Sequence, residues 1–199
     1  MTVILGLTGG IASGKSTADE FFKKKNIPIV DADKIAHHIY DKDQTAYSLV
    51  VDKFGKKILA KDQSVDRKKL GQIVFSDVNK LHELNKITHP FILKEIKQQL
   101  RSQSKNHALV IADIPLLFES HGENLCDKIL VISIPEKLQI QRLMARNNLT
   151  AKEARERINS QMPLAEKVKK ATYVVDNAGT IEELEEKLNK ILDKIKLGE

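Results

Sequence analysis

The chain has 199 residues, with 33 lysine and arginine residues against 27 aspartate and glutamate residues, which gives a net charge of +6. Apolar residues make up 41% and charged residues 30%, while glycine and proline number only 9 and 5. This composition excludes an intrinsically disordered, collagenous or low-complexity chain. No apolar run approaches the roughly 20 residues that cross a membrane, and the length predicts one domain with room for an insertion.

The cysteine content and the charge indicate the cellular compartment and the kinds of partner. Cys126 is the single cysteine, so no disulfide can form within the chain, and the N-terminus lacks the basic start and long apolar core of a signal peptide. We therefore expect a protein of the reducing cytoplasm. The positive charge suits nucleic acid, an acidic membrane surface or phosphorylated small molecules, but most lysines are interspersed with acids, which is typical of solvated helix faces.

Short apolar runs alternate with helical stretches along the chain. The predicted strands are Val3–Thr8, Ile27–Val30, Ala108–Ile114, Ile129–Ile134 and Tyr173–Val175. A helix is expected over Lys15–Lys25, with Ala18, Phe21 and Phe22 on its inner side, and a long, mostly helical stretch from Asp33 to about Arg101. Because the strands do not alternate between apolar and polar residues, they predict an α/β fold with a parallel sheet covered on both faces.

Capping boxes of the form S/T-x-x-E predict three further helix starts, at Ser133–Glu136, Thr150–Glu153 and Thr180–Glu183. The last of these helices carries one apolar stripe, which we expect to pack on the sheet. The stripe consists of Ile181, Leu184, Leu188, Ile191 and Ile195.

A glycine-rich motif follows the first predicted strand and precedes the first predicted helix. The pattern G-x-x-x-x-G-K-[ST] is matched by Gly9, Gly10, Ile11, Ala12, Ser13, Gly14, Lys15 and Ser16. Its glycines let the backbone turn tightly and bring N–H groups against phosphate oxygens. Lys15 can reach the β- and γ-phosphates, the Ser16 hydroxyl can ligate Mg²⁺, and Thr17 follows near the α-phosphate. The motif therefore predicts a nucleotide-binding phosphate loop.

The phosphate loop alone leaves a small-molecule kinase, a GTPase switch and a nucleic-acid motor open. Asp52–Gly55 reads D-x-x-G, as in a GTPase switch, but Asn85–Thr88 lacks the acid of an N-K-x-D guanine motif. We interpret Thr45–Gly55 instead as a helix that ends at a glycine cap.

Acidic residues follow two of the predicted strands, where ligands bind in open α/β sheets. Asp31 or Asp33 can accept the proton of a hydroxyl that attacks the γ-phosphate, as the base of a kinase does. Their spacing suits a cap of the helix that begins near Lys34 equally well. Asp113 ends the third strand, where it is either an acid near Mg²⁺ or a turn residue.

Arginines gather in the region before the last strand. Arg142 and Arg146 are four residues apart and share a helix face, and Arg155 and Arg157 follow. On a mobile segment such arginines can close over ATP and stabilise transition-state charge. Without other context, an exposed amphipathic helix explains them as well.

Taken together, these segments resemble the dephospho-CoA kinase family over essentially the whole chain. The resemblance rests on GLTGGIASGKST at Gly6–Thr17, VDAD at Val30–Asp33, ITHP at Ile87–Pro90, DIPLLFE at Asp113–Glu119, the arginine-bearing stretch Gln141–Pro163 and VVDNAGT at Val174–Thr180. The one departure from the family pattern is Ala12, which is often glycine in the family. The resemblance implies transfer of the γ-phosphate of ATP to the ribose 3′-hydroxyl of dephospho-CoA, which gives CoA and ADP.

The resemblance also implies a P-loop NTPase-type three-layer fold with a five-stranded parallel sheet. The core would span about residues 1–32, 105–140 and 170–199, with a helical CoA-binding insert at about 33–104 and a lid at about 141–169. Asp33 becomes the general base, and Arg142 and Arg146 become lid residues facing the ATP phosphates. Asn177 and Gly179 fall where the family contacts adenine. The acceptor side is shaped by His89, Pro90, Leu116, Leu117, Phe118 and Glu119.

Three other functions stay open from the sequence: another P-loop small-molecule kinase, a nucleic-acid-stimulated P-loop ATPase, and a nucleotide-binding regulator without catalysis, which Asp33 and the lid arginines disfavour. The second predicts salt-dependent binding to DNA or RNA, yet the chain has no basic stretch with interleaved aromatics for base stacking. We expect ATP, Mg²⁺ and dephospho-CoA as ligands, no nucleic-acid or membrane partner, and a monomer or small homo-oligomer.

Overall fold

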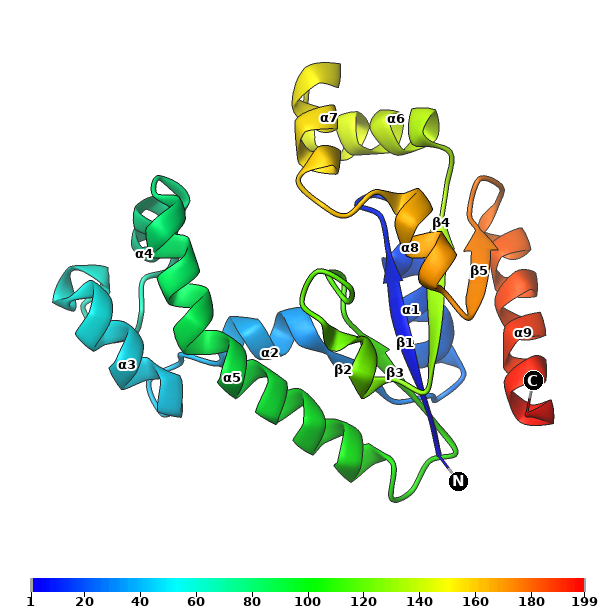
Figure 1. Ribbon diagram of the computed structural model, residues 1–199, viewed down its shortest axis with the longest axis horizontal. Helices are drawn as coiled ribbons and strands as arrows, with labels where there is room; N and C mark the ends of the chain where they lie inside the picture. Colours follow the sequence, from blue (N-terminus) through cyan, green and yellow to red (C-terminus); the bar gives the residue numbers. More distant parts are fainter. Residues whose placement is uncertain (1, 199) are drawn as a thin grey trace. The chain divides into compact units, whose positions relative to one another are not determined.

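The computed structural model describes residues 2–198 and contains a five-stranded sheet with the strand order β2-β3-β1-β4-β5 (Figure 1). The strands are β1 (Val3–Gly9), β2 (Ile29–Asp31), β3 (Leu109–Asp113), β4 (Lys128–Ser133) and β5 (Tyr173–Asp176). β1 pairs in parallel with both β3 and β4, and β4 pairs in parallel with β5. The parallel α/β sheet predicted from the apolar runs is confirmed, with each strand close to its expected bounds.

Helices connect the strands and also form the long stretch between β2 and β3. They are α1 (Lys15–Lys24), α2 (Ala32–His38), α3 (Thr45–Phe54), α4 (Arg67–Phe75), α5 (Val78–Gln103), α6 (Glu136–Asn147), α7 (Ala151–Asn159), α8 (Leu164–Lys170) and α9 (Ile181–Leu197), with short 3₁₀ turns η1 (Lys56–Ile58) and η2 (Gly122–Leu125). None of the helices among residues 2–198 combines the length and the apolar character needed to cross a bilayer.

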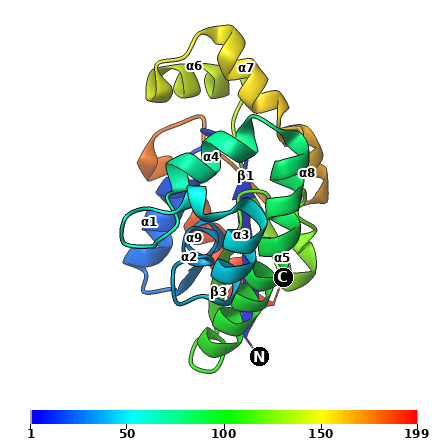
Figure 2. The same cartoon turned by 90° about the vertical axis from the view of Figure 1, so that its left-hand side faces the viewer.

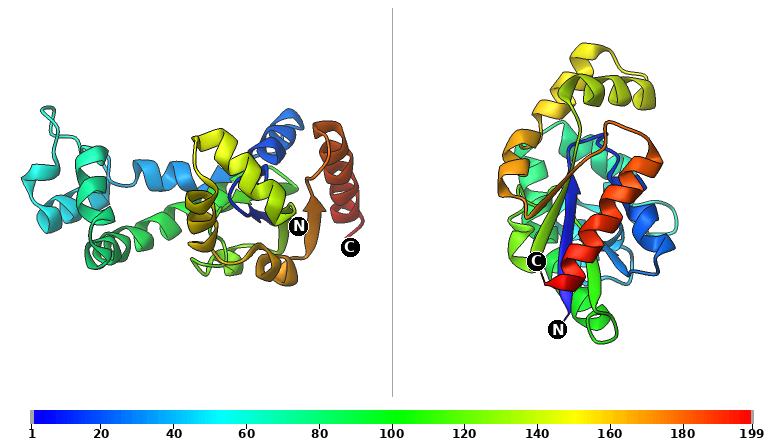
Figure 3. Two further views of the ribbon diagram at one scale, coloured as in Figure 1. Left: turned by 90° about the horizontal axis from the view of Figure 1, so that it is seen from above. Right: turned by 90° about the vertical axis from the view of Figure 1, so that its right-hand side faces the viewer.

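The chain divides into two compact units, one of which contains Asp31–Gln99 and the other the residues up to Val30 and from Leu100 onward. In the second of these, α1 and α9 cover one face of the sheet, while α8 lies on the other face (Figures 1 and 3). Phe21 and Phe22 of α1 pack with the apolar strand residues in one core, as the helical periodicity predicts. This unit therefore has three layers.

The unit formed by Asp31–Gln99 is built from helices and has its own core (Figure 2). That core consists of Val50, Phe54, Ile58, Val65, Leu70 and Val74. The stretch is not helical throughout, because Leu59 and Val65 form an isolated antiparallel bridge. α3 ends at Phe54, and its C-cap is Gly55, whose φ of 79° only glycine adopts readily, so the predicted glycine cap is confirmed.

Two local predictions at helix starts need correction. Thr150 and Thr180 form their capping boxes, but Ser133 does not, because it is still paired to Asp176 as the last residue of β4. α6 begins three residues later, after Pro135, which has a fixed φ suited to a helix start. Ile181 is also 57% exposed, so the predicted stripe of α9 begins at Leu184.

Candidate active site at the phosphate loop

The glycine-rich motif forms the connection between β1 and α1, and we call residues Gly9–Ser16 the phosphate loop. Gly14 is the N-cap of α1, with φ 93° and ψ 23°, and no side chain caps this helix end. The first N–H groups of a helix have no acceptor within the helix, and the helix dipole adds positive charge at the same place. The loop therefore offers a binding site for an anion, and phosphate is the group that suits it.

Lys15 is held between two carboxylates at the first turn of α1. Its Nζ lies 2.6 Å from Asp113 Oδ1 and 3.4 Å from Asp19 Oδ2. Burial lowers the pKa of Lys15, but the two carboxylates outweigh burial and raise it above its usual value. Burial also raises the pKa of Asp19. The ammonium group is thus charged at neutral pH and fixed beside the carboxyl end of β3.

Two glutamines hold the backbone of the phosphate loop from outside. The N–H of Ile11 donates to Gln161 Oε1 at 3.2 Å, and Gln139 Nε2 donates to the C=O of Ile11 at 2.9 Å. Gln139 belongs to α6 and Gln161 to the connection between α7 and α8. Sequence reasoning assigned neither residue a role, because a single glutamine in a charged helix carries no pattern.

The side chains of Arg142 and Asn177 approach the phosphate loop at Gly14. Asn177 Nδ2 donates to the C=O of Ser13 at 2.8 Å, and a methyl group at Gly14 would lie 2.0 Å from that Nδ2 and 3.9 Å from an Arg142 guanidinium nitrogen. Arg146, in contrast, is exposed and donates from Nε to Asn147. The structure thus brings Arg142 to the loop but leaves Arg146 on the outside of α6.

Glu119, in the segment after β3, binds the chain before α8 and Lys167 on α8. Glu119 Oε1 accepts from the N–H of Met162 at 2.9 Å and lies 2.8 Å from Nζ of Lys167. Burial raises the pKa of Glu119, but the hydrogen bonds from Lys167 and Met162 outweigh burial, so the pKa lies below its usual value. Leu117 and Phe118 are buried, whereas Leu116 is 45% exposed. Gly179 is exposed, beside Glu183.

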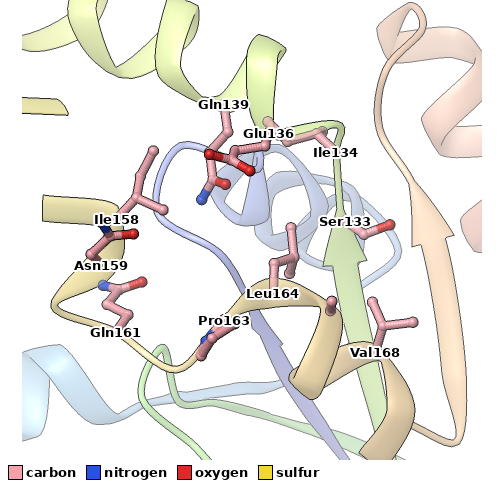
Figure 4. A pocket seen from close by; sticks show the side chains of 11 residues that line it. Ser133, Ile134, Glu136, Gln139, Ile158, Asn159, Gln161, Pro163, Leu164 and Val168 are labelled. Carbon is pink, nitrogen blue, oxygen red and sulfur yellow. The ribbon is translucent and has the colours of Figure 1, made fainter. Parts of the chain in front are cut away.

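A cavity of about 550 Å³ lies between the end of β4, the first turns of α6, the end of α7 and α8 (Figure 4). Gln139 and Gln161 line it together with Glu136, Asn159 and residues at the end of β4 and the start of α8. Neither Lys15 nor Asp113 is among the residues that line it. The cavity is therefore separate from the place where Lys15 presents its charge.

The remaining predicted residues belong to the unit formed by Asp31–Gln99. Asp31 is the N-cap of α2 and accepts from the N–H of Lys34 at 2.9 Å. The capping role that the sequence left open therefore falls to Asp31. Asp33 lies in the first turn of α2 and is exposed, and His89 and Pro90 lie exposed on α5.

The donors that suit a magnesium ion are the Ser16 hydroxyl and the Asp113 carboxylate. Ser16 is exposed in the first turn of α1, and Asp113 is 4% exposed at the end of β3. Both offer hard oxygen atoms, which Mg²⁺ prefers, so the residues fit the ion. Within residues 2–198 no three His, Cys, Asp or Glu side chains cluster as a metal site would require.

Comparison with known proteins places the chain in a family. The family model described as dephospho-CoA kinase matches residues 3–183. The chain is 59% identical over 196 residues to the dephospho-CoA kinase of Lactobacillus johnsonii, with 98% of this chain and 99% of the relative covered. It is 48% identical to that of Enterococcus faecalis, with 98% of each covered.

The chain belongs to the dephospho-CoA kinase family. The solved dephospho-CoA kinase from Campylobacter jejuni has a TM-score of 0.79 at 34% identity, covering 100% of this chain and 99% of that one. A shikimate kinase from Aquifex aeolicus has a TM-score of 0.55 at 16% identity and shares the fold alone. Family membership makes this chain a kinase, and the P-loop kinase fold predicted from its sequence is confirmed.

Proposed function

We propose that this dephospho-CoA kinase family member transfers the γ-phosphate of ATP to the ribose 3′-hydroxyl of dephospho-CoA. The observation that supports this most is the match to relatives of nearly equal length that carry the name dephospho-CoA kinase. The phosphate loop supplies the nucleotide site that such a reaction needs, with a charged lysine fixed at its end.

Each part of the site has a role in the proposed reaction. The N–H groups of the phosphate loop bind the ATP phosphates, and Lys15 exchanges its contact with Asp113 for the phosphate oxygens. Arg142 lies beside the loop and adds positive charge where charge develops, and Arg146 joins it when the lid closes. Mg²⁺ bound by Ser16 and Asp113 would neutralise phosphate charge.

We assign the general base to Asp33 and leave Asp31 as its neighbour. Asp31 accepts from the N–H of Lys34 as the N-cap of α2, which supports a structural role for that carboxylate. Asp33 follows the carboxyl end of β2, where α/β proteins bind ligands, and its exposed carboxylate would accept the proton of the attacking hydroxyl.

The other assigned contacts follow the family resemblance. Asn177 and Gly179 border adenine, and His89, Pro90 and the segment Leu116–Glu119 shape the acceptor side. Because Leu117 and Phe118 are buried, we assign them to holding this segment in shape and Leu116 to the contact itself. The cytoplasm is the proposed compartment, and the enzyme acts without nucleic acid.

A phosphoryl-transfer assay tests the proposal. The purified protein is given ATP, Mg²⁺ and one acceptor from a panel of dephospho-CoA, nucleosides, nucleotides and shikimate, and the product is identified by mass. We expect dephospho-CoA alone to gain one phosphoryl group. A product formed from another acceptor, with dephospho-CoA unchanged, would show that this is a different small-molecule kinase.

Asp33→Asn tests the base. We expect kcat to fall about 100-fold or more, which is the usual contribution of a positioned base, while ATP binding stays nearly intact. Asp31→Asn is the matched control, because asparagine also caps helices well and should keep most of the activity. Near-wild-type turnover of Asp33→Asn would remove Asp33 from the mechanism.

A further inference from the structure

Lys167 is a lysine in an unusual place. It is 0% exposed, although it belongs to α8 in a stretch of exposed lysines, and Lys169 on the same helix has a side chain that is 71% exposed. A buried ammonium group is costly unless it is paired and its protons are hydrogen-bonded. The contacts of Lys167 therefore have to supply both an opposite charge and acceptors for its protons.

Three oxygen atoms surround the Lys167 ammonium. Glu119 Oε1 lies at 2.8 Å, the carbonyl oxygen of Pro115 at 3.3 Å and that of Gly9 at 3.4 Å. An ammonium group has three protons to donate, so the three acceptors use all of them. Glu119 supplies the opposite charge, and the two carbonyl groups leave no proton of the ammonium unpaired.

The two carbonyl groups belong to the turns that carry the catalytic groups. Gly9 is the last residue of β1 and the first of the phosphate loop, and Pro115 follows Asp113, the partner of Lys15, by two residues. The Pro115 carbonyl also accepts from Thr8 Oγ1 at 2.8 Å. Lys167 thus joins the ends of two neighbouring strands at the edge where Lys15 meets Asp113.

We propose that Lys167 is a positioning residue for phosphoryl transfer, which holds the phosphate loop and the Asp113 turn at the separation that ATP requires. This inference rests on the proposed function and assigns a role in it to a residue outside the phosphate-binding motif. Lys167 acts through the Gly9 and Pro115 carbonyls rather than by touching ATP. Because Glu119 also binds the N–H of Met162, the same cluster fixes the chain just before α8 to the loop.

The test compares Lys167→Met with Lys167→Met/Glu119→Gln. In the single variant, the Glu119 carboxylate and both carbonyl groups lose their partner. In the double variant no unpaired carboxylate remains, but the two carbonyl groups still lack the ammonium. We expect Lys167→Met to lower kcat/KM for ATP at least about tenfold, because small displacements at a reacting centre are costly. The KM for dephospho-CoA is measured beside it, because Glu119 belongs to the segment assigned to the acceptor side.

The split between the constants separates positioning from stability. A variant that is only less stable loses active enzyme, so kcat falls while both KM values stay the same. We expect instead that the KM for ATP rises and stays raised in the double variant, even where its thermal midpoint recovers. Recovery of the ATP constants together with the midpoint would overturn the proposal.

Two further variants keep the test decisive. Lys169→Met alters an exposed lysine of α8 that pairs with Glu166, and we expect wild-type constants from it. Glu119→Gln keeps Lys167 and its carbonyl contacts, so its KM for ATP should rise less than that of the double variant. The double variant, which leaves no unpaired carboxylate, serves if Lys167→Met fails to fold. Wild-type activity with dephospho-CoA is measured first, so that failure of the proposed function is recognised separately. An unchanged KM for ATP in the double variant, which lacks the Lys167 ammonium, would refute the role of Lys167.

Discussion

Gly14 provides a quantitative test of how the phosphate loop is built. At its φ of 93° and ψ of 23°, a residue with a Cβ is strained by about 1–2 kcal/mol. An alanine methyl would also lie 2.0 Å from Asn177 Nδ2, so Asn177 must give up its hydrogen bond to the buried Ser13 carbonyl, which costs about 1–3 kcal/mol. Gly14→Ala should therefore lower the free energy of unfolding by about 3 kcal/mol in total.

A double-mutant cycle with Asn177→Ala separates the two contributions. Asn177→Ala alone loses the hydrogen bond, which should cost about 2 kcal/mol. In that background the methyl group meets no amide, so Gly14→Ala should cost only its conformational strain, about 1–2 kcal/mol. The two substitutions should therefore couple by at least about 1 kcal/mol.

Urea unfolding followed by far-UV circular dichroism measures these free energies, since the chain has no tryptophan to report by fluorescence. The m-values of the four proteins must agree for the comparison to hold. Costs that add to within about 0.5 kcal/mol would show that Gly14 and Asn177 are independent, and would refute the close contact as the reason for glycine at this position.

Three further predictions use groups outside the phosphate loop. Thr180→Ala removes the capping box of α9 and should lower the free energy of unfolding by about 1 kcal/mol in the same urea experiment; no loss would mean that water caps the helix equally well. Burial, with Asp127 and Glu123, raises the pKa of Cys126 from 9.0 to about 12. At pH 8 the thiolate fraction then falls roughly 1000-fold, so a disulfide reagent should react far more slowly with the native protein than with the unfolded protein; equal labelling rates would contradict this. The pKa of Glu119 is lower in the folded protein than its usual value of 4.5, so its ionised carboxylate stabilises the fold above pH 4.5. This stabilisation is lost as the pH falls through the lower folded pKa, so the difference in free energy of unfolding between wild type and Lys167→Met should shrink from pH 6 to pH 3; a constant difference would count against the ion pair.

The sheet and the phosphate loop could be predicted because their signals are local. A buried parallel strand is a continuous apolar run, and the phosphate loop is a set of consecutive residues whose chemistry follows from their types. Thr150 and Thr180 likewise act within one helical turn. Ser133 shows the limit, because its local pattern is a capping box but pairing with Asp176 keeps it in β4. Tertiary pairing overrides the local preference there.

The supports of the phosphate loop could not be predicted because their partners are distant in the chain. Gln161 binds Ile11 across 150 residues, and Asn177 binds Ser13 across 164. No periodicity or spacing relates such pairs, and only the fold brings α6, α8 and β5 to the loop. The family resemblance of the sequence implied that Asn177 contacts adenine. The structure adds a hydrogen bond from its side chain to the backbone of the phosphate loop.

Lys167 shows why burial has to be seen before such a residue can be interpreted. In sequence it is one of three lysines at the end of a short, highly charged helix, and a solvated face is the ordinary reading of that pattern. Only one of the three, Lys167, turns toward the sheet, and there its charge is stable only because Glu119 and two carbonyls receive it. An apolar side chain would fill the same space without needing a buried countercharge or hydrogen-bond acceptors. The choice of lysine at this position is therefore better explained by what its protons hold, the ends of β1 and β3, than by packing.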